Sequence, residues 1–152
     1  MSRIQAANQT TARVTPADYE VLSEFRYLIR RFLEFSEDAA QAAGLTPRQH
    51  QALLAIRGFA AGQSITIGNL AERLRIRHHS AVELVDRLVA AGLVLRAHDA
   101  GDHRRVLLSL TRRADDCLAA LSATHLDELA RLEPSLKKIL ASRRKSGGGE
   151  KG

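Results

Sequence analysis

Residues 66–88 read TIGNLAERLRIRHHSAVELVDRL, and this stretch decides the fold. Its apolar residues recur at helical spacing on both sides of a short break at residues 75–77. Two closely crossing helices need a small residue where they meet; Ala71 supplies it, and Ile76 fills the turn. The inward positions are Leu70, Ala71, Leu74, Ile76, Ala81 and Leu84. The pattern predicts a helix-turn-helix whose second helix runs from about residue 78 to about residue 91.

After this motif the apolar period changes from helical to alternating. Residues 93–97 and 105–110 are two strand candidates, and the polar stretch 98–104 between them holds Gly101 for a tight turn. This pattern predicts a β-hairpin with a charged tip. Ahead of the motif, residues 64–67 are long enough only for a strand stub.

Long helices are predicted on both sides of this central region. Thr15 begins the first as an N-cap, and Gly44 ends it. A capping-box pattern at Thr46 opens a second helix, which is expected to end near Gly58 and Gly62.

After the hairpin the chain is predicted to return to helix, with Thr111 as its cap. The apolar residues of this helix recur every three or four positions like a heptad seam, with His125 filling a gap. The seam consists of Leu118, Leu121, Leu129, Leu132, Leu136 and Ile139. Pro134 lies inside this stretch and predicts a kink or a break into two helices.

The charge is unevenly distributed along the 152 residues. The chain carries 23 basic and 17 acidic residues, and its net charge is +6. Residues 46–113 contain eleven arginines against five acids, so the whole excess lies in the helix-turn-helix and hairpin region. A local basic excess is typical of surfaces that bind nucleic acid, and a solvated basic face is the alternative.

The composition argues against several other classes. One cysteine, Cys117, excludes an intramolecular disulfide and a multi-cysteine zinc site. No apolar run approaches the roughly 18 residues of a membrane span, and the start of the chain lacks the apolar stretch of a signal peptide. We therefore expect a cytoplasmic protein. We find no nucleophile elbow, phosphate-binding glycine loop or metal-spaced cluster, so we expect neither an enzyme nor a cofactor or metal.

The second helix of the motif has the diameter that fits the major groove of B-DNA, where its N-terminal residues contact base edges. We predict that the hairpin lies beside it, with Arg104 in the minor groove and Asp102 orienting that arginine. The predicted recognition residues are Arg77, His78, His79, Ser80, Val82, Glu83 and Arg87. The predicted hairpin contacts are Asp102, His103, Arg104 and Arg105, and the predicted phosphate contacts are Thr66, Arg73, Arg75 and Arg96.

These residues carry a resemblance to a known family. Segments 67–74, 84–88 and 92–96, with the hairpin sequence DAGDHRRVLLSLT at 99–111, resemble the MarR family of bacterial transcription regulators. The Asp-x-Arg tip lies at the correct distance after the helix-turn-helix, which makes the match specific. The resemblance covers roughly residues 17–140.

The resemblance implies a homodimer with winged-helix DNA-binding lobes and a dimerisation lobe made from both chain ends. The apolar faces of the two long helices support the dimer independently, because they are too long to bury against one small lobe. A dimer on double-stranded DNA predicts an inverted-repeat operator with half-sites about 10 bp apart.

The resemblance also implies a small aromatic or carboxylated effector that releases the DNA. We place the candidate effector contacts at His50, Tyr27 and His125. A satisfied buried histidine is the alternative for His50 and for His125.

The expected fold is mainly α with a small β-hairpin wing. It combines a winged helix-turn-helix lobe with a helical dimerisation lobe built from the N- and C-terminal helices. The expected boundaries are a flexible N-terminus at 1–14, an N-terminal dimerisation helix at 15–45, the DNA-binding lobe at 46–111, C-terminal dimerisation helices at 112–142 and a flexible tail at 143–152.

Two arginines and two acids of the motif need explanation. Arg75 stands where such turns often have glycine, which predicts a looser turn. Arg77 stands at the start of the recognition helix, where a cation is unfavourable unless a phosphate is near. Glu83 and Asp86 would repel phosphates. We expect Asp86 to pair with an arginine of its own subunit, preferably one of the wing, and Glu83 either to accept from a cytosine amine or to be a plain surface residue.

Two other functions are weighed against DNA binding. Winged helices also serve as protein-interaction or dimerisation modules without specific DNA binding, but a docking face needs an apolar centre, and this region is basic. An enzyme is the second alternative, and the acids argue against it because they lie on helix surfaces at ion-pair spacing.

Overall fold

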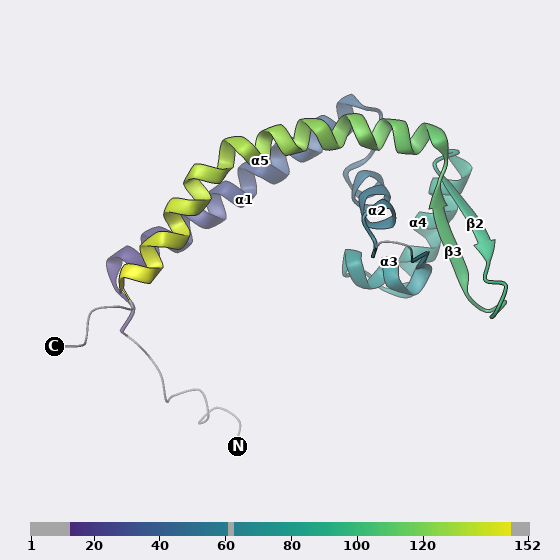
Figure 1. The fold of residues 1–152 in the computed structure, drawn as a ribbon, viewed down its shortest axis with the longest axis horizontal. Coiled ribbons are helices and arrows are strands. Elements are labelled where there is room, and N and C mark those ends of the chain that lie inside the picture. The colour runs from purple at the N-terminus through teal and green to yellow at the C-terminus, as the bar shows by residue number, and fades with distance from the viewer. Residues whose placement is uncertain (1–12, 61–62, 147–152) are drawn as a thin grey trace, which may run out of the picture. The chain divides into compact units, whose positions relative to one another are not determined.

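The structure, a computed structural model, describes residues 13–60 and 63–146 (Figure 1). The predictions for residues 1–12, Gly62 and residues 147–152 lie outside this range. The elements in chain order are α1 (Pro16–Ala42), α2 (Pro47–Arg57), β1 (Ile65–Thr66), α3 (Ile67–Leu74), α4 (His78–Ala90), β2 (Val94–His98), β3 (Val106–Leu110) and α5 (Arg112–Ser146). The fold is mainly helical with one small antiparallel sheet, as predicted.

The chain forms two compact units. Residues 34–127 make one, and the residues up to Leu33 together with those from Glu128 onward make the other. The long helices α1 and α5 contribute to both. We call these the central unit and the terminal unit.

The predicted helix-turn-helix is present in the central unit as α3 and α4. Leu70, Ala71, Ala81 and Leu84 are buried, and Leu74 and Ile76 are half-buried against the same core. Thr66 begins α3 through a capping box. Its hydroxyl accepts the backbone N–H of Asn69 at 3.1 Å, and its own N–H donates to the Asn69 side chain at 3.2 Å. These bonds satisfy two backbone donors that a helix start leaves open.

The turn between α3 and α4 is closed, so the prediction of a looser turn at Arg75 is wrong. Arg75 adopts the left-handed conformation, with φ of +56°. Its backbone N–H donates to Glu72 O at 3.1 Å, and the N–H of Ile76 donates to Ala71 O at 3.0 Å. Two hydrogen bonds and the packing of Ile76 hold a conformation that a non-glycine residue adopts only at a cost.

The predicted hairpin is β2 and β3, within one residue at each end. The strands are antiparallel, with Val94 opposite Leu110 and His98 opposite Val106. The stub β1 adds a third strand, because Ile65 pairs with Leu108 and gives the sheet the order β1-β3-β2. The wing is therefore joined through β3 to the strand that immediately precedes α3.

One apolar core holds the central unit together. Its largest fully buried side chains are Leu53, Ile65, Leu70, Val85, Leu88 and Val94. The first turns of α5 add Ala114, Leu118 and Leu121 to this core. Thr111 begins α5 as predicted, since its hydroxyl accepts the N–H of Ala114 at 3.2 Å and donates to Gly92 O at 2.8 Å. The β2–β3 hairpin and α4 are thus fixed on one packed body.

The terminal unit has a smaller core between α1 and α5. Leu28, Leu132 and Ile139 are buried in it, with Val21, Phe32 and Leu136 packed around them. The predicted break into two helices at Pro134 is wrong: α5 continues from Arg112 to Ser146 with this proline inside. A proline removes one helical hydrogen bond, and here the buried residues on both sides of it keep the flanking turns in place. The helix also includes residues 143–146, which the sequence pattern assigns to the tail.

We expect Thr66→Ala to destabilise the protein by about 1 kcal/mol, because it removes the hydroxyl that caps α3. The free energy of unfolding from urea titrations measures this. Thr124→Ala is the matched control, because Thr124 is exposed within α5 and its hydroxyl only donates to Ala120 O. An equal destabilisation of the two variants would contradict a specific capping role for Thr66.

Candidate nucleic-acid interface

The helix α4 presents the predicted recognition residues on its outer side. Arg77, His78, His79, Glu83 and Arg87 are exposed. The neighbouring Ser80 and Val82 are half-buried. The opposite side is fixed in the core by Ala81, Leu84, Val85 and Leu88. The sequence pattern thus predicted the inner side of this helix correctly, whereas two of the predicted outer residues, Ser80 and Val82, are only partly exposed.

The start of α4 has no side-chain cap. Arg77 is the N-cap residue, with an extended backbone, and its side chain makes no capping hydrogen bond. Because a helix N-terminus carries partial positive charge and unsatisfied N–H groups, this end attracts an anion. An arginine and two histidines at the same end add further donors for phosphate oxygens.

The tip of the wing is ordered by aspartates that hold its backbone. Asp102 accepts the backbone N–H of Arg104 at 3.0 Å, so it holds the main chain of that residue. From the sequence it was predicted to orient the guanidinium of Arg104 instead. Asp99 lies 3.4 Å from the guanidinium of Arg105. Among the described residues, the guanidinium of Arg104 has no ion-pair partner. The tip thus keeps one arginine paired and offers the other to an anion.

The two histidines of the wing do not face each other as metal ligands. The Nδ1 of His98 contacts the backbone O of His103 at 3.1 Å, so this ring helps to close the hairpin. No group of three or more histidine, cysteine, aspartate or glutamate side chains in residues 13–60 and 63–146 is arranged to hold a metal ion.

A cavity of about 450 Å³ joins α3, α4 and the wing. It brings the N-terminal turn of α3 together with His78 of α4 and the two adjacent arginines at the tip of the wing. Its lining residues are Thr66, Ile67, Gly68, Asn69, His78, Arg104, Arg105 and Val106. Two guanidinium groups, an imidazole and a helix N-terminus around one cavity make an environment that favours an oxyanion such as a phosphate.

The recognition helix is tied to the wing by an ion pair. Arg96 of β2 donates to Asp86 of α4 at 2.6 Å, which is the pairing we predicted for Asp86. Arg96 therefore acts as a tether between α4 and β2 as well as a candidate phosphate contact. The other two arginines predicted to contact phosphates are Arg73, which lies in α3, and Arg75, which directly follows it. The guanidinium of Arg73 lies 5.6 Å from the centre of the Phe59 ring, and Arg75 is exposed.

The predicted effector contacts divide between the two units. In the central unit, His50 is buried, and its ring centre lies 4.8 Å from that of His125. The Nδ1 of His125 donates to Leu121 O at 2.7 Å, and its Nε2 lies 2.8 Å from the hydroxyl of Ser36. In the terminal unit, Tyr27 is exposed, and Arg31 lies over its ring.

This pair of histidines has an electrostatic cost when protonated. Burial lowers the pKa of His50, and positive charge on His125 lowers it further. The carbonyl of Leu121 can only accept, so Nδ1 of His125 carries the proton and Nε2 accepts from Ser36 in the neutral ring. The two rings thus join α1, α2 and α5 through these contacts.

Several contributing residues were missed by the sequence analysis. Asn69 completes the capping box at α3, but the usual box has Glu or Gln at this position, so the motif was overlooked. Asp99 pairs with Arg105 across the tip. The predicted hairpin places these two residues opposite each other, and this spacing could have predicted the pair. Gly68 and Val106 line the cavity only because the sheet brings β3 beside α3.

Two further observations concern the described residues. Cys117 is half-buried against the core of the central unit. None of the helices described here combines the length and the hydropathy needed to cross a membrane.

The family comparison agrees with the resemblance carried by the motif. The model of the MarR family matches residues 43–105. An uncharacterised HTH-type transcriptional regulator of Bacillus subtilis (strain 168), YcgE, is 38% identical over 84 residues, which are 55% of this chain and 53% of that protein. The match therefore spans about half the length of this curated relative.

Solved structures share the fold. RV1404 from Mycobacterium tuberculosis has a TM-score of 0.68 at 22% identity, with 93% of this chain and 100% of that chain covered. MepR, a transcription regulator of the Staphylococcus aureus multidrug efflux pump MepA, has a TM-score of 0.65 at 18% identity, with 78% and 94% covered. A MepR mutant bound to an oligodeoxyribonucleotide has a TM-score of 0.62 at 20% identity, with 86% and 99% covered.

The lowered pKa of His50 predicts a loss of stability in acid. The folded state binds a proton at His50 less readily than the unfolded chain does. Stability therefore falls as pH drops below the unfolded pKa of about 6.5. We expect the free energy of unfolding to fall less in His50→Gln than in the wild type between about pH 7.5 and about pH 5.5. Parallel decreases of the free energy of unfolding in the two proteins would show that His50 is not the group responsible. The control is His79→Gln at an exposed position, which is expected to behave as the wild type does.

The Asp86–Arg96 tether predicts a small, salt-dependent coupling. Both side chains are about half exposed, so a double-mutant cycle of Asp86→Asn and Arg96→Gln is expected to give a coupling energy of about 0.2–1 kcal/mol in urea unfolding. Raising the salt concentration screens the pair and lowers the coupling. A zero coupling at low salt would mean that the two charges do not act on each other in solution.

Proposed function

We propose that this chain, whose residues 43–105 belong to the MarR family of transcription regulators, is a homodimeric, sequence-specific DNA-binding regulator. The observation that carries the proposal is the grouping of the uncapped start of α4, the start of α3 and the basic tip of the wing around one cavity. Three elements distant in sequence there converge on groups that bind phosphate.

The electrostatics of the central unit support contact with the DNA backbone. The net excess of six positive charges lies within residues 46–113. On this proposal α4 enters the major groove, Arg104 reaches into the minor groove and the cavity beside His78 receives a backbone phosphate. The solved MepR mutant with bound oligodeoxyribonucleotide shares this fold and supports the assignment.

The terminal unit offers a surface for a second copy of the chain. Large apolar side chains of α1 that do not face its core are exposed; they are Tyr19, Leu22, Phe25, Ile29 and Leu33. Exposed apolar rows of this length mark interaction surfaces. On α5, Leu129 and Leu140 add to the exposed apolar area. Burial against the same surface of a second copy satisfies these side chains in a closed, symmetric dimer.

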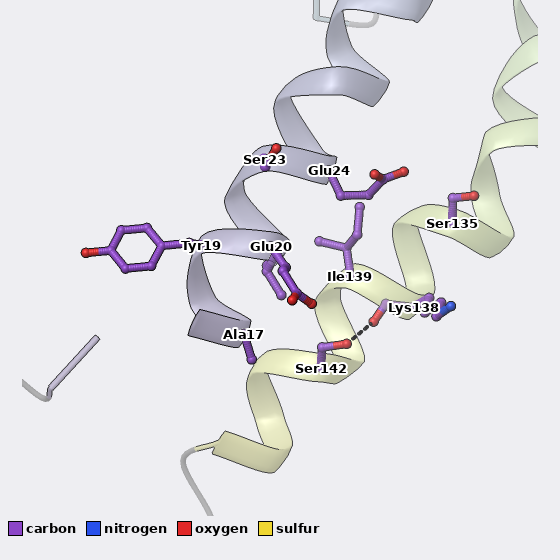
Figure 2. Close-up of a pocket in the computed structure, with 10 residues that line it drawn as sticks. Ala17, Tyr19, Glu20, Ser23, Glu24, Ser135, Lys138, Ile139 and Ser142 are labelled. Carbon is purple, nitrogen blue, oxygen red and sulfur yellow. Dashed lines mark hydrogen bonds between the residues drawn. The ribbon is translucent and has the colours of Figure 1, made fainter. Parts of the chain in front are cut away.

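A groove between α1 and α5 adds charged groups to this surface (Figure 2). Its volume is about 760 Å³, and it is lined by Glu20 and Glu24 of α1 and by Lys138 and Ile139 of α5, among others. In Figure 2 the Tyr19 ring points away from α5. On our proposal the partner copy covers the exposed rings, and the charges around the groove set the register of the dimer.

The dimer accounts for the kind of operator that we propose. Two symmetric recognition helices enter successive major grooves, so the operator is an inverted repeat with half-sites about 10 bp apart. We further propose repression that is relieved by a small aromatic or carboxylated ligand, with the adjacent His50 and His125 of the central unit as the candidate contacts. This last part rests on the family resemblance.

Neutralising the wing is expected to weaken DNA binding and its salt dependence. The double variant Arg104→Gln, Arg105→Gln removes the two guanidinium groups that line the cavity at the wing tip, where we place the DNA. The slope of log affinity against log salt therefore falls in magnitude by about 0.9 for each phosphate that is no longer neutralised. Fluorescence anisotropy measures this with a labelled duplex from upstream of the coding region.

The matched control is Arg48→Gln, Arg57→Gln, which removes the same charge from exposed positions on α2. Equal effects of the two double variants would mean that the wing arginines contribute only through the net charge of the protein. Unchanged affinity and slope in the wing variant would overturn the proposed interface, and a stable dimer without DNA affinity at low salt would favour a protein-interaction module.

A further inference from the structure

The row of α4 that carries His79 and Arg87 also contains one acid, Glu83. Glu83 is exposed in the second turn, between His79 and Arg87 at a spacing of four residues on each side. Side chains at this spacing lie along one row of a helix. Glu83 therefore lies in the middle of the row that our proposed function directs into the major groove.

The two acids of α4 differ in how their charge is used. Asp86 is held by Arg96 at 2.6 Å. The carboxylate of Glu83 has neither an ion pair nor a hydrogen bond with any residue of the described ranges, although His79 and Arg87 stand one turn before and after it. An acid with no partner on a DNA-facing helix costs binding free energy through repulsion from phosphates, unless a donor on the DNA meets it.

Only one base edge suits a carboxylate in this position. A carboxylate accepts hydrogen bonds and donates none. In the major groove cytosine presents the N4 amine as a donor, whereas guanine presents two acceptors, and adenine places its N7 acceptor next to its N6 donor. A glutamate is therefore matched by cytosine and opposed by the acceptors of the purines.

We propose that Glu83 is a specificity-determining residue that selects a cytosine at one position of each half-site by accepting a hydrogen bond from its N4 amine. This inference rests on the proposed function. His79 and Arg87 on either side then supply donors to neighbouring bases or phosphates. The repulsion that Glu83 exerts on every other sequence adds to the discrimination.

The test uses a pool of DNA duplexes with a randomised central region. The full-length wild type, Glu83→Gln and Glu72→Gln each select their preferred duplexes from this pool, and the selected sequences are compared. Glu72 is exposed on α3, outside the row. Glu72→Gln therefore serves as the control, because it removes the same charge away from the row. We expect a C·G pair at one position of each wild-type half-site. Glu83→Gln should lower the preference for cytosine by about tenfold or more and favour adenine there, because glutamine pairs bidentately with adenine. Glu72→Gln should keep the wild-type motif.

Two outcomes would overturn the inference, and they have different meanings. If the wild type and Glu83→Gln select the same motif with the same base preferences, Glu83 does not read a base, while the proposed function stands. This includes the case in which Glu83→Gln only binds every duplex more tightly, which indicates general repulsion. If the wild type selects no motif, sequence-specific binding fails and the inference fails with it.

Discussion

The close crossing of α3 and α4 is the constraint on which the central unit depends. Ala81 is fully buried and Ala71 nearly so, which lets the two helix backbones approach. The left-handed Arg75 and the hydrogen bonds that close its turn set the angle at which α4 leaves α3. Since Leu84, Val85 and Leu88 then hold α4 in the core, its outer row is fixed in direction. The wing follows, because β3 pairs both with β1, directly before α3, and with β2, directly after α4.

Acids in this unit mainly place the arginines. Asp86 ties Arg96 to the recognition helix, and Asp99 and Asp102 order the wing tip. Each such pair is exposed and contributes little to stability by itself. At the wing tip, Asp99 and Asp102 hold Arg105 and the main chain of Arg104 beside a cavity at the start of two helices, where backbone N–H groups already favour an anion. Glu83 is the exception within α4, which is why we assign it to base recognition.

The parts of the fold that local chemistry controls could be predicted from the sequence. Helix starts at Thr46, Thr66 and Thr111, the period change at the hairpin and the inward positions of the motif are local signals, and the structure has them. The break into two helices at Pro134 was wrongly predicted, because buried neighbours from α1 support α5 around it. The left-handed Arg75 and the partners of the wing aspartates depend on tertiary packing, which no local pattern specifies. The contact between His50 and His125 joins residues far apart in the chain. Both were predicted from the sequence as candidate effector contacts, but the meeting of their rings was not predicted.

The central claim is that the central unit binds a particular DNA sequence through charge and base contacts together. The most direct test is fluorescence anisotropy of the full-length protein with labelled DNA from just upstream of its coding region, at several salt concentrations and with unlabelled random duplex as competitor. We expect tight binding that weakens steeply with salt and that random duplex does not displace. Binding that random duplex displaces as readily as the same unlabelled sequence would contradict it.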